Sequence, residues 1–288
     1  MVRPPAAPVE NVVAVAVAVA AKPMSKPPPR DLSLEGWTEA LHDKWAANLT
    51  FQELRKGAQA VSDVYVHGRA KGGLAKRAVD GRAKRAAFAC YYGVIHAIVV
   101  SELFGPRGPL RIPAGVRCLD FGCGPGALGA GLAAGGAEPS SVHGLDLVGA
   151  NVEMARWTYD WWGLTGGARV GRLPRALGTP RTTDLIGFGW CVNELIPADR
   201  KALWGPLQAA VVAGSGILLI EPLSRRAVSW WSEAERALCH DGAKSIEFRV
   251  RVDLPTRVRD LDRATGLNHS EVGARVLFKP PGGSGTSR

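Results

Sequence analysis

The apolar positions in the second part of the chain fall into short continuous runs separated by longer segments with helical spacing. Short apolar runs are typical of buried parallel strands, and the periodic segments between them are typical of helices that cover a sheet. Their alternation predicts an α/β fold, a Rossmann-like doubly wound sheet. The predicted strands are 116–119, 141–145, 168–173, 184–190, 216–220, 248–252 and 274–279, and the predicted helices are 150–162, 198–212, 224–238 and 256–265.

The residues before this alternation predict helices. Between Trp37 and Leu49, bulky apolar residues recur every four positions, which is one face of a helix. Thr50 is a candidate N-cap for a second helix that opens at Phe51, because its side-chain oxygen can accept a hydrogen bond from the first turn. Residues 86–100 are almost wholly apolar, which predicts a helix buried against the sheet domain.

These patterns divide the chain into four parts. Residues 1–34 are a low-complexity extension that we expect to be disordered, 35–105 a basic helical region, 106–280 the sheet domain and 281–288 a flexible tail. The Val/Ala run from Val12 to Ala21 is too short to span a bilayer, so we expect no membrane association. A targeting segment is the alternative interpretation of this extension.

One stretch carries the strongest functional signal. The predicted first strand ends in Asp120, and three glycines follow at alternate positions before a helical run begins at Ala127: Gly122, Gly124 and Gly126. Glycines after a strand let the backbone turn sharply and let a ligand approach main-chain atoms. The helix that follows points its N-terminal N–H groups at that ligand.

Two kinds of ligand compete for this turn. Gly124 to Gly129 fits the dinucleotide pattern G-x-G-x-x-G, but a pyrophosphate beside Asp120 would place two anions in a poorly solvated crevice, where they repel. A positively charged ligand gains from the same carboxylate. Asp146 ends the next predicted strand, 20 residues beyond Gly126, where an acid can accept hydrogen bonds from ribose hydroxyls. The pattern therefore favours a cationic nucleoside without phosphate, and an NAD-dependent oxidoreductase is the weaker alternative.

The spacing Asp-x-Gly-x-Gly-x-Gly at 120–126, followed by Asp146, resembles motif I of the class I S-adenosylmethionine (SAM) methyltransferases. The resemblance covers residues 112–279 and implies SAM as cofactor and a last strand that is antiparallel. This chain departs from the family at one point, because no acid lies between Asp160 and Asp184 to meet the adenine amino group. The cofactor-binding residues implied are Asp120, Gly122, Gly124, Gly126, Asp146 and Leu147.

The family resemblance also points to residues outside motif I. The segment before the first strand often covers the methionine end of the cofactor in this family. Arg85, Tyr92 and His96 are therefore candidates for holding its carboxylate or the acceptor. For each of these residues, a purely structural role is the alternative.

The acceptor site in this fold lies after the fourth strand, where the chain carries Asn193 and Glu194. Methyl transfer requires a nucleophile held in line with the sulfonium methyl group, and some nucleophiles must lose a proton. We predict that Asn193 orients the acceptor and that Glu194 binds a donor group or acts as a base. Capping of the next helix is the alternative. The Asn/Asp-Pro-Pro-aromatic motif of nucleobase amino-group methyltransferases is absent here, and Cys191 lacks the Pro-Cys context of a cytosine-C5 enzyme.

The charge of the chain suggests a partner. The net charge is +10, and residues 1–115, with 16 basic and 9 acidic residues, contribute +7 of it. A basic helical region suggests an acidic partner, with RNA the first candidate, and a solvated basic face is the alternative. A looser resemblance connects the chain to the branch with the mitochondrial small-ribosomal-subunit methyltransferase-like assembly proteins, which implies ribosomal RNA or a ribosomal particle. It rests on residues 84–92, 193–195 and 221–222.

The five cysteines limit further which kinds of site the chain can hold. Their number is odd and no Cys-x-x-Cys occurs, which argues against a disulfide framework and a zinc site and favours a reducing, cytoplasmic compartment. Late in the chain only Cys239-His240 stands where the mitochondrial branch often carries a cysteine cluster, so no iron–sulfur cluster is implied.

The sequence thus predicts a SAM-dependent methyltransferase, with RNA as a possible acceptor. Two alternatives stay open: a methyltransferase that acts on a small molecule or a protein, and a SAM-binding ribosome-assembly factor without turnover.

Overall fold

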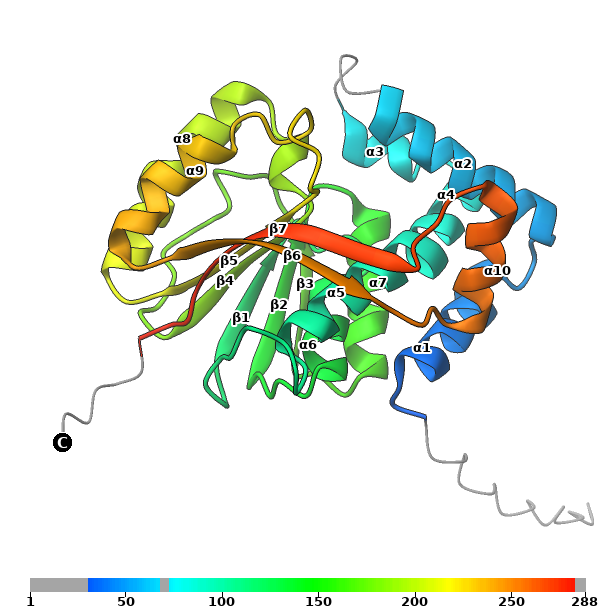
Figure 1. The fold of residues 1–288 in the computed structure, drawn as a ribbon, viewed down its shortest axis with the longest axis horizontal. Coiled ribbons are helices and arrows are strands. Elements are labelled where there is room, and N and C mark those ends of the chain that lie inside the picture. Colours follow the sequence, from blue (N-terminus) through cyan, green and yellow to red (C-terminus); the bar gives the residue numbers. More distant parts are fainter. Residues whose placement is uncertain (1–30, 68–72, 283–288) are drawn as a thin grey trace, which may run out of the picture. The chain divides into compact units, whose positions relative to one another are not determined.

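In the computed structural model, which describes residues 31–67 and 73–282, seven strands form one mixed sheet in the order β3-β2-β1-β4-β5-β7-β6 (Figure 1). β1 to β5 are parallel, and β7 runs antiparallel to both of its neighbours. The order 3-2-1-4-5 is that of a doubly wound fold, so the predicted fold class and the antiparallel last strand are confirmed. The strands are β1 (Arg117–Phe121), β2 (Ser141–Asp146), β3 (Gly166–Val170), β4 (Asp184–Gly189), β5 (Gly216–Glu221), β6 (Lys244–Arg251) and β7 (Glu271–Lys279).

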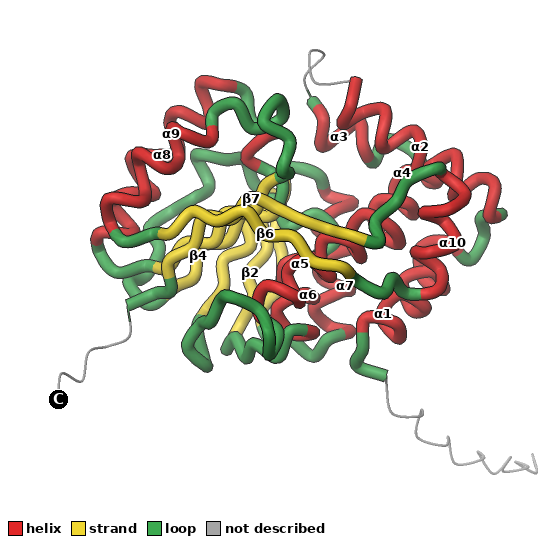
Figure 2. Tube along the Cα trace, in the orientation of Figure 1, coloured by secondary structure: helices red, strands yellow, loops and turns green. Residues whose placement is uncertain are grey.

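The sheet separates two hydrophobic cores, each covered by helices (Figure 2). Successive residues of a strand point to opposite faces. In β5, Ile217 and Leu219 therefore belong to the core beneath α8 and α9, and Leu218 and Ile220 belong to the core beneath α5, α6 and α7. Burial on both faces explains why this strand is a continuous apolar run. The helices that follow β1 are α6 (Ala127–Ala134), α7 (Gly149–Trp161), α8 (Pro197–Val212), α9 (Trp231–Leu238) and α10 (Thr256–Thr265).

Helix α9 corrects one prediction, because it begins at Trp231 rather than at Ser224. Between these residues the chain makes turns in which Ala227 and Val228 donate backbone hydrogen bonds to the Ser224 carbonyl. The Ser224 hydroxyl also accepts from the N–H of Ala227 (3.4 Å). Serine side chains offer the backbone such alternatives to a helix. Ser224, which predicts a helix start, therefore begins a turn instead.

In the described part of the chain, the helices that precede the sheet pack with it in one compact unit that starts at Asp31. Thr50 caps α2 as predicted, since its Oγ1 accepts from the N–H of Glu53 (3.2 Å) while the Glu53 carboxylate accepts from the N–H of Thr50 (2.7 Å). The helices are α1 (Leu34–Leu41), α2 (Phe51–His67), α3 (Leu74–Ala78), α4 (Arg82–Ala87) and α5 (Val94–Phe104), with π-helical turns at His42–Ala46 and Phe88–Gly93.

The predicted apolar helix is part of a longer one. Arg82 to Phe104 forms a 23-residue helix which, among the described residues, is long and apolar enough to cross a membrane by length and composition. Within the protein, however, 78% of its apolar window is buried. Its apolar character is therefore that of a core helix.

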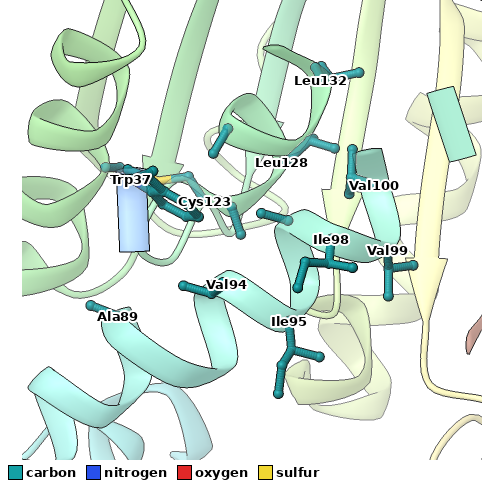
Figure 3. Packing of buried hydrophobic residues seen from close by; sticks show 14 of the residues in the cluster. Trp37, Ala89, Val94, Ile95, Ile98, Val99, Val100, Cys123, Leu128 and Leu132 are labelled. Carbon is teal, nitrogen blue, oxygen red and sulfur yellow. The ribbon is translucent and has the colours of Figure 1, made fainter. Parts of the chain in front are cut away.

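Helices α5 and α6 approach closely because α6 carries a glycine at their contact. A Cβ on Gly131 would lie 2.4 Å from the Cβ of Val100 and 2.6 Å from the carbonyl oxygen of Ala97. Figure 3 shows the apolar side chains of α5 beside Leu128 and Leu132 of α6. This contact fixes the position of α5, which contributes to the cavity described below.

Replacing Gly131 by leucine is expected to destabilise the protein by about 2 kcal/mol or more, because the backbone of α5 must move to admit the side chain. Gly149→Ala is the matched control, since Gly149 is the first residue of α7 and has nothing within 4 Å of its Cβ position. Urea denaturation gives the free energy of unfolding of both variants. Equal midpoints for Gly131→Leu and the native chain would contradict the close approach.

Candidate functional site

A cavity of about 650 Å³ lies at the carboxyl ends of the parallel strands. Residues at the ends of β1, β2 and β4 form its floor, and α2, α3, the π turn at Phe88–Gly93, α5 and the loop before β7 form its walls. Ligands of doubly wound sheets bind at this edge, where the strand order reverses. A second cavity of about 670 Å³ beside α1 and β6 has neither the glycine turn nor any predicted site residue in its lining, so the first is the candidate site.

The cavity brings together most of the residues that the sequence predicted for the site. Lining it are Tyr92, His96, Asp120, Gly122, Gly124, Asp146, Leu147, Asn193 and Glu194. Two others lie outside the lining. Gly126 precedes α6, and a Cβ at this position would face Thr158 and Tyr159 of α7, so glycine here allows α7 to pack closely. Arg85 is exposed on α4, and this position does not support a direct cofactor contact.

The glycine turn has the conformation that its sequence requires. Gly122, Gly124 and Gly126 have φ values of 69°, 50° and 86°, which side chains disfavour. At Gly122 space is also limiting, because a Cβ would lie 2.4 Å from the Cβ of Cys191. The N–H of Gly122 donates to the carbonyl of Leu145 in β2 (2.7 Å). The turn is therefore fixed between β2 and the segment after β4.

Two buried carboxylates lie beside this turn. Asp120 is 1% exposed and accepts a hydrogen bond from the Tyr159 hydroxyl (2.8 Å). Burial raises the pKa of Asp120 to about 7, although the Tyr159 hydrogen bond opposes this. Asp146 accepts hydrogen bonds from the N–H groups of Gly124 (3.0 Å) and Val148 (2.8 Å), and burial still raises its pKa. Both acids are held where an ionised carboxylate is poorly solvated.

The charged groups that line the cavity are mostly acidic. Within residues 31–67 and 73–282, the lining has five acids and two bases, which gives a formal charge of −3. The acids are Asp120, Asp146, Glu194, Asp199 and Glu271, and the bases are Lys76 and Arg172. Arg172 is paired with Asp199 (3.1 Å). The cavity is suited to a cationic ligand more than to a polyanion.

Trp190, directly after β4, is the non-glycine residue of the described chain with a positive φ, 56°. Its ring stacks on that of His96 from α5, with the centroids 3.9 Å apart and the planes 3° from parallel. Burial lowers the pKa of His96 to about 3, so the imidazole is neutral. Left-handed backbone at a bulky residue stores strain that is characteristic of functional sites. The stack gives the cavity a flat aromatic wall.

Asn193 and Glu194 follow in a single 3₁₀ turn, Val192–Glu194. The side-chain amide of Asn193 donates to the Trp190 carbonyl (2.9 Å) and to Glu221 Oε2 (2.6 Å), and its N–H donates to Glu221 Oε1 (3.0 Å). Burial raises the pKa of Glu221 to about 8. Glu194 accepts from the hydroxyl of Tyr65 on α2 (2.9 Å). Asn193 thus supports the turn that positions Trp190, and Glu194 is tied to the N-terminal helices.

Cys191 does not have the surroundings of a nucleophile. Its thiol donates to the Phe121 carbonyl (3.0 Å), and burial, followed by nearby carboxylates, raises its pKa well above the usual value. Both effects oppose thiolate formation. The described cysteines are free, and in the part of the chain that the structure describes no group of three His, Cys, Asp or Glu side chains could hold a metal ion.

Among the cavity residues that were not anticipated as parts of the site are Tyr65, Trp190 and His269. Trp190 could have been recognised from the sequence, since it lies at the end of the predicted fourth strand, just before the candidate residues Asn193 and Glu194. Tyr65 and His269 could not, because the helix and loop that carry them are distant in sequence from the glycine turn and are brought to it by packing.

Comparison with known proteins gives neither a family model nor a curated protein that matches the sequence. Structures similar to parts of the chain do exist. Precorrin-6y C5,15-methyltransferase from Geobacter metallireducens is 10% identical over 64% of this chain and 84% of its own, with a TM-score of 0.40. The arsenic(III) S-adenosylmethionine methyltransferase of Chlamydomonas reinhardtii is 20% identical over 59% and 67%, with a TM-score of 0.35.

The [4+2]-cyclase SpnF is as similar as these two proteins, at 16% identity over 64% of this chain and 81% of its own, with a TM-score of 0.38. Methyltransferases are prominent among the similar structures, but identities and scores this low do not assign an activity. The looser resemblance to the mitochondrial branch gains no support from these matches. The fold assignment rests on the strand order of this chain itself.

Asp120→Asn is expected to stabilise the unliganded protein at high pH. The folded state keeps the Asp120 proton up to about pH 7, while the unfolded state loses it near the ordinary pKa of 3.8. Raising the pH between these values therefore favours unfolding of the native chain. The variant should match the native chain at about pH 4 and exceed its free energy of unfolding at about pH 8 by on the order of 4 kcal/mol.

Chemical denaturation of both proteins across this pH range measures the difference. Asp253→Asn, which changes an exposed acid outside this cavity, is the control and should show no such pH dependence. A difference between Asp120→Asn and the native chain that does not change with pH would show that Asp120 is ionised at low pH in the folded protein.

Proposed function

We propose that the protein is a SAM-dependent methyltransferase. The observation that carries this proposal is a left-handed glycine turn between two buried carboxylates, in a cavity whose described charged groups sum to −3. A dinucleotide brings a pyrophosphate, which this charge repels. SAM brings an ammonium and a sulfonium group without phosphate, and the same charge attracts both.

The cavity residues fit such a cofactor. Asp146 would accept hydrogen bonds from the ribose hydroxyls, and Asp120 with the glycine turn would meet the cationic methionine part. Leu147, which is 44% exposed, and Leu173 line the cavity beside the backbone of Gly171. They offer an apolar surface to the adenine ring at the point where the family's acid is missing.

The acceptor would lie beyond β4. The aromatic wall of Trp190 and His96 can take a flat or apolar group against it, and the Tyr65–Glu194 pair can hydrogen-bond to that group. Asn193 acts by fixing the turn that positions Trp190. These residues would bind and orient the acceptor beside the cofactor, which would supply the methyl group.

Calorimetric titration tests the cofactor. SAM is expected to bind, and its affinity should fall as the pH is lowered through about 7, because protonation of Asp120 removes the charge that attracts it. Asp120→Asn should weaken binding at about pH 8 and remove most of this pH dependence, while the exposed-site variant Glu138→Gln should behave as the native chain. Binding of NAD without binding of SAM would overturn the proposal.

Transfer of a labelled methyl group from SAM into separated RNA, protein and small-molecule pools identifies the class of acceptor. Label in one pool distinguishes RNA from a protein or a small molecule. Tight SAM binding without label in any pool would favour an assembly factor that has lost turnover.

For the acceptor we propose RNA, with ribosomal RNA or a ribosomal particle as the form in which it is met. The support is the charge of +7 on residues 1–115 and the position of basic helices beside the cavity. Lys76 of α3 lines the cavity, and Arg82 and Arg85 are exposed on α4. A polyanion bound along α3 and α4 would therefore lie next to the cavity while its charge stays outside.

Arg85→Glu is expected to weaken RNA binding and to reduce the steepness with which the affinity falls as salt increases, because about one phosphate contact is lost. Arg236→Glu, which reverses an exposed charge on α9, is the matched control. Filter binding or fluorescence anisotropy with total ribosomal RNA at several salt concentrations measures the slope. Equal slopes for both variants would argue against this surface.

A further inference from the structure

A second group of side chains meets the cavity from the C-terminal part of the chain. His269 lies in the loop between α10 and β7 and lines the cavity. Asp262 on α10 is 5% exposed, and one of its oxygens accepts hydrogen bonds from Nδ1 of His269 (2.6 Å) and from the hydroxyl of Tyr91 (2.5 Å). Its other oxygen accepts from the backbone N–H of His269 (2.9 Å). The loop and the imidazole ring are both fixed by this carboxylate.

These contacts determine which ring nitrogen carries the proton. Burial raises the pKa of Asp262, but the hydrogen bonds from His269 and Tyr91 outweigh burial and hold it below its usual value. Asp262 is therefore an ionised acceptor, so Nδ1 of neutral His269 carries the proton and Nε2 keeps its lone pair. Within the described ranges, the hydrogen bonds of this ring are made at Nδ1, and the side chain is 29% exposed. Nε2 is thus left for a ligand in the cavity.

The groups around His269 come from four elements. Asp262 faces it from α10 and Tyr91 from the π turn, and His96 on α5 is close enough for His269 to lower its pKa. Glu271 of β7 lines the same cavity. Of these neighbours, Asp262 (2.6 Å) and the Tyr91 hydroxyl (3.2 Å) contact Nδ1 of the ring directly.

Two other proton acceptors of the cavity, His96 and Glu194, are less suited to this role. His96 has a pKa of about 3, chiefly because it is buried, and its ring is stacked on Trp190. Glu194 already accepts a hydrogen bond from Tyr65. His269 combines a place in the lining, an orienting carboxylate and a lone pair, the arrangement of a general base.

We propose that His269, oriented by Asp262, is the general base of the methyl transfer and that the acceptor is a neutral hydroxyl or N–H group; this rests on the methyltransferase function proposed above. The acceptor oxygen or nitrogen forms a bond to the methyl carbon of the donor, and the carbon–sulfur bond breaks with its electron pair left on sulfur. The acceptor's proton passes to Nε2. Asp262 stabilises the resulting imidazolium, which releases its proton to solvent before the next turnover.

The tautomer can be tested without any acceptor. Nitrogen NMR of the full chain labelled at histidine, with the His269 signals assigned by their loss in His269→Gln, is expected to show neutral His269 protonated at Nδ1. Asp262→Asn should raise the fraction of rings protonated at Nε2, because an amide oxygen is a weaker acceptor than a carboxylate for the Nδ1 proton. A neutral ring protonated at Nε2 overturns the proposal, since no lone pair would then be available to the acceptor.

Activity tests the role itself. With tritiated SAM and two acceptor pools, total RNA and a deproteinised cell extract, His269→Gln is expected to lower the initial rate by about a hundredfold or more. Its SAM affinity by calorimetry should be unchanged, and its residual rate should rise at high pH, where the acceptor ionises by itself. Asp262→Asn should lower the rate in proportion to the fraction of Nδ1-protonated ring that NMR shows to be lost, which a purely structural tie would not do. His143→Gln, at an exposed histidine of β2 outside this cavity, is the control.

The outcomes separate the two proposals. If the native chain binds no SAM, the methyltransferase function fails whatever the tautomer of His269. If it transfers methyl groups and His269→Gln is as fast as His143→Gln, only the role of His269 fails. SAM binding without transfer to either pool, or to a protein pool tested alongside them, overturns both turnover and the assignment of a base.

Discussion

The structure depends on two carboxylates that are held out of water at neighbouring strand ends. Asp120 lies near the end of β1 and Asp146 is the last residue of β2, and the two strands pair in parallel, so the acids share one edge of the sheet. Among the described residues, hydroxyl and N–H dipoles meet them, from Tyr159 and from Gly124. Dipoles orient a carboxylate but only partly replace its hydration. The glycine turn and α7 are therefore arranged around a negative charge that a cationic ligand would neutralise.

The cavity is closed by two groups of segments, one before the first strand in the sequence and one near the C-terminal end. The π turn and α5 come before β1, while the loop that carries His269 comes after the last helix. Tyr91 and Asp262, 171 residues apart, join these segments through one short hydrogen bond. The antiparallel β7 makes this possible, because it begins at the same edge where the parallel strands end. A parallel last strand would have left its preceding loop at the opposite edge.

Much of this arrangement could be predicted from the sequence, because it is encoded locally. Apolar runs and helical periods gave the sheet, and Asp120 with its glycines gave the position of the cavity. The helix start at Ser224 was wrong because a serine serves a turn as well as a cap. Arg85 was expected near the cofactor only because of its position in the family resemblance. Which face of α4 points to the cavity depends on how the helices pack, and the sequence does not show this. His269 could not be found at all, since its importance comes from Asp262 and Tyr91, which no local pattern connects to it.

Trp190 shows how far the site departs from what folding alone would choose. Left-handed backbone at a residue with a bulky side chain costs on the order of 1–3 kcal/mol, and glycine at this position would release that cost. The aromatic ring would be lost with it. Selection for solubility or expression alone would thus favour replacement of Trp190. Selection for turnover would retain an aromatic residue there, although that residue disfavours the left-handed backbone. An aromatic residue at position 190 would then distinguish related sequences that keep the function from those that keep only the fold.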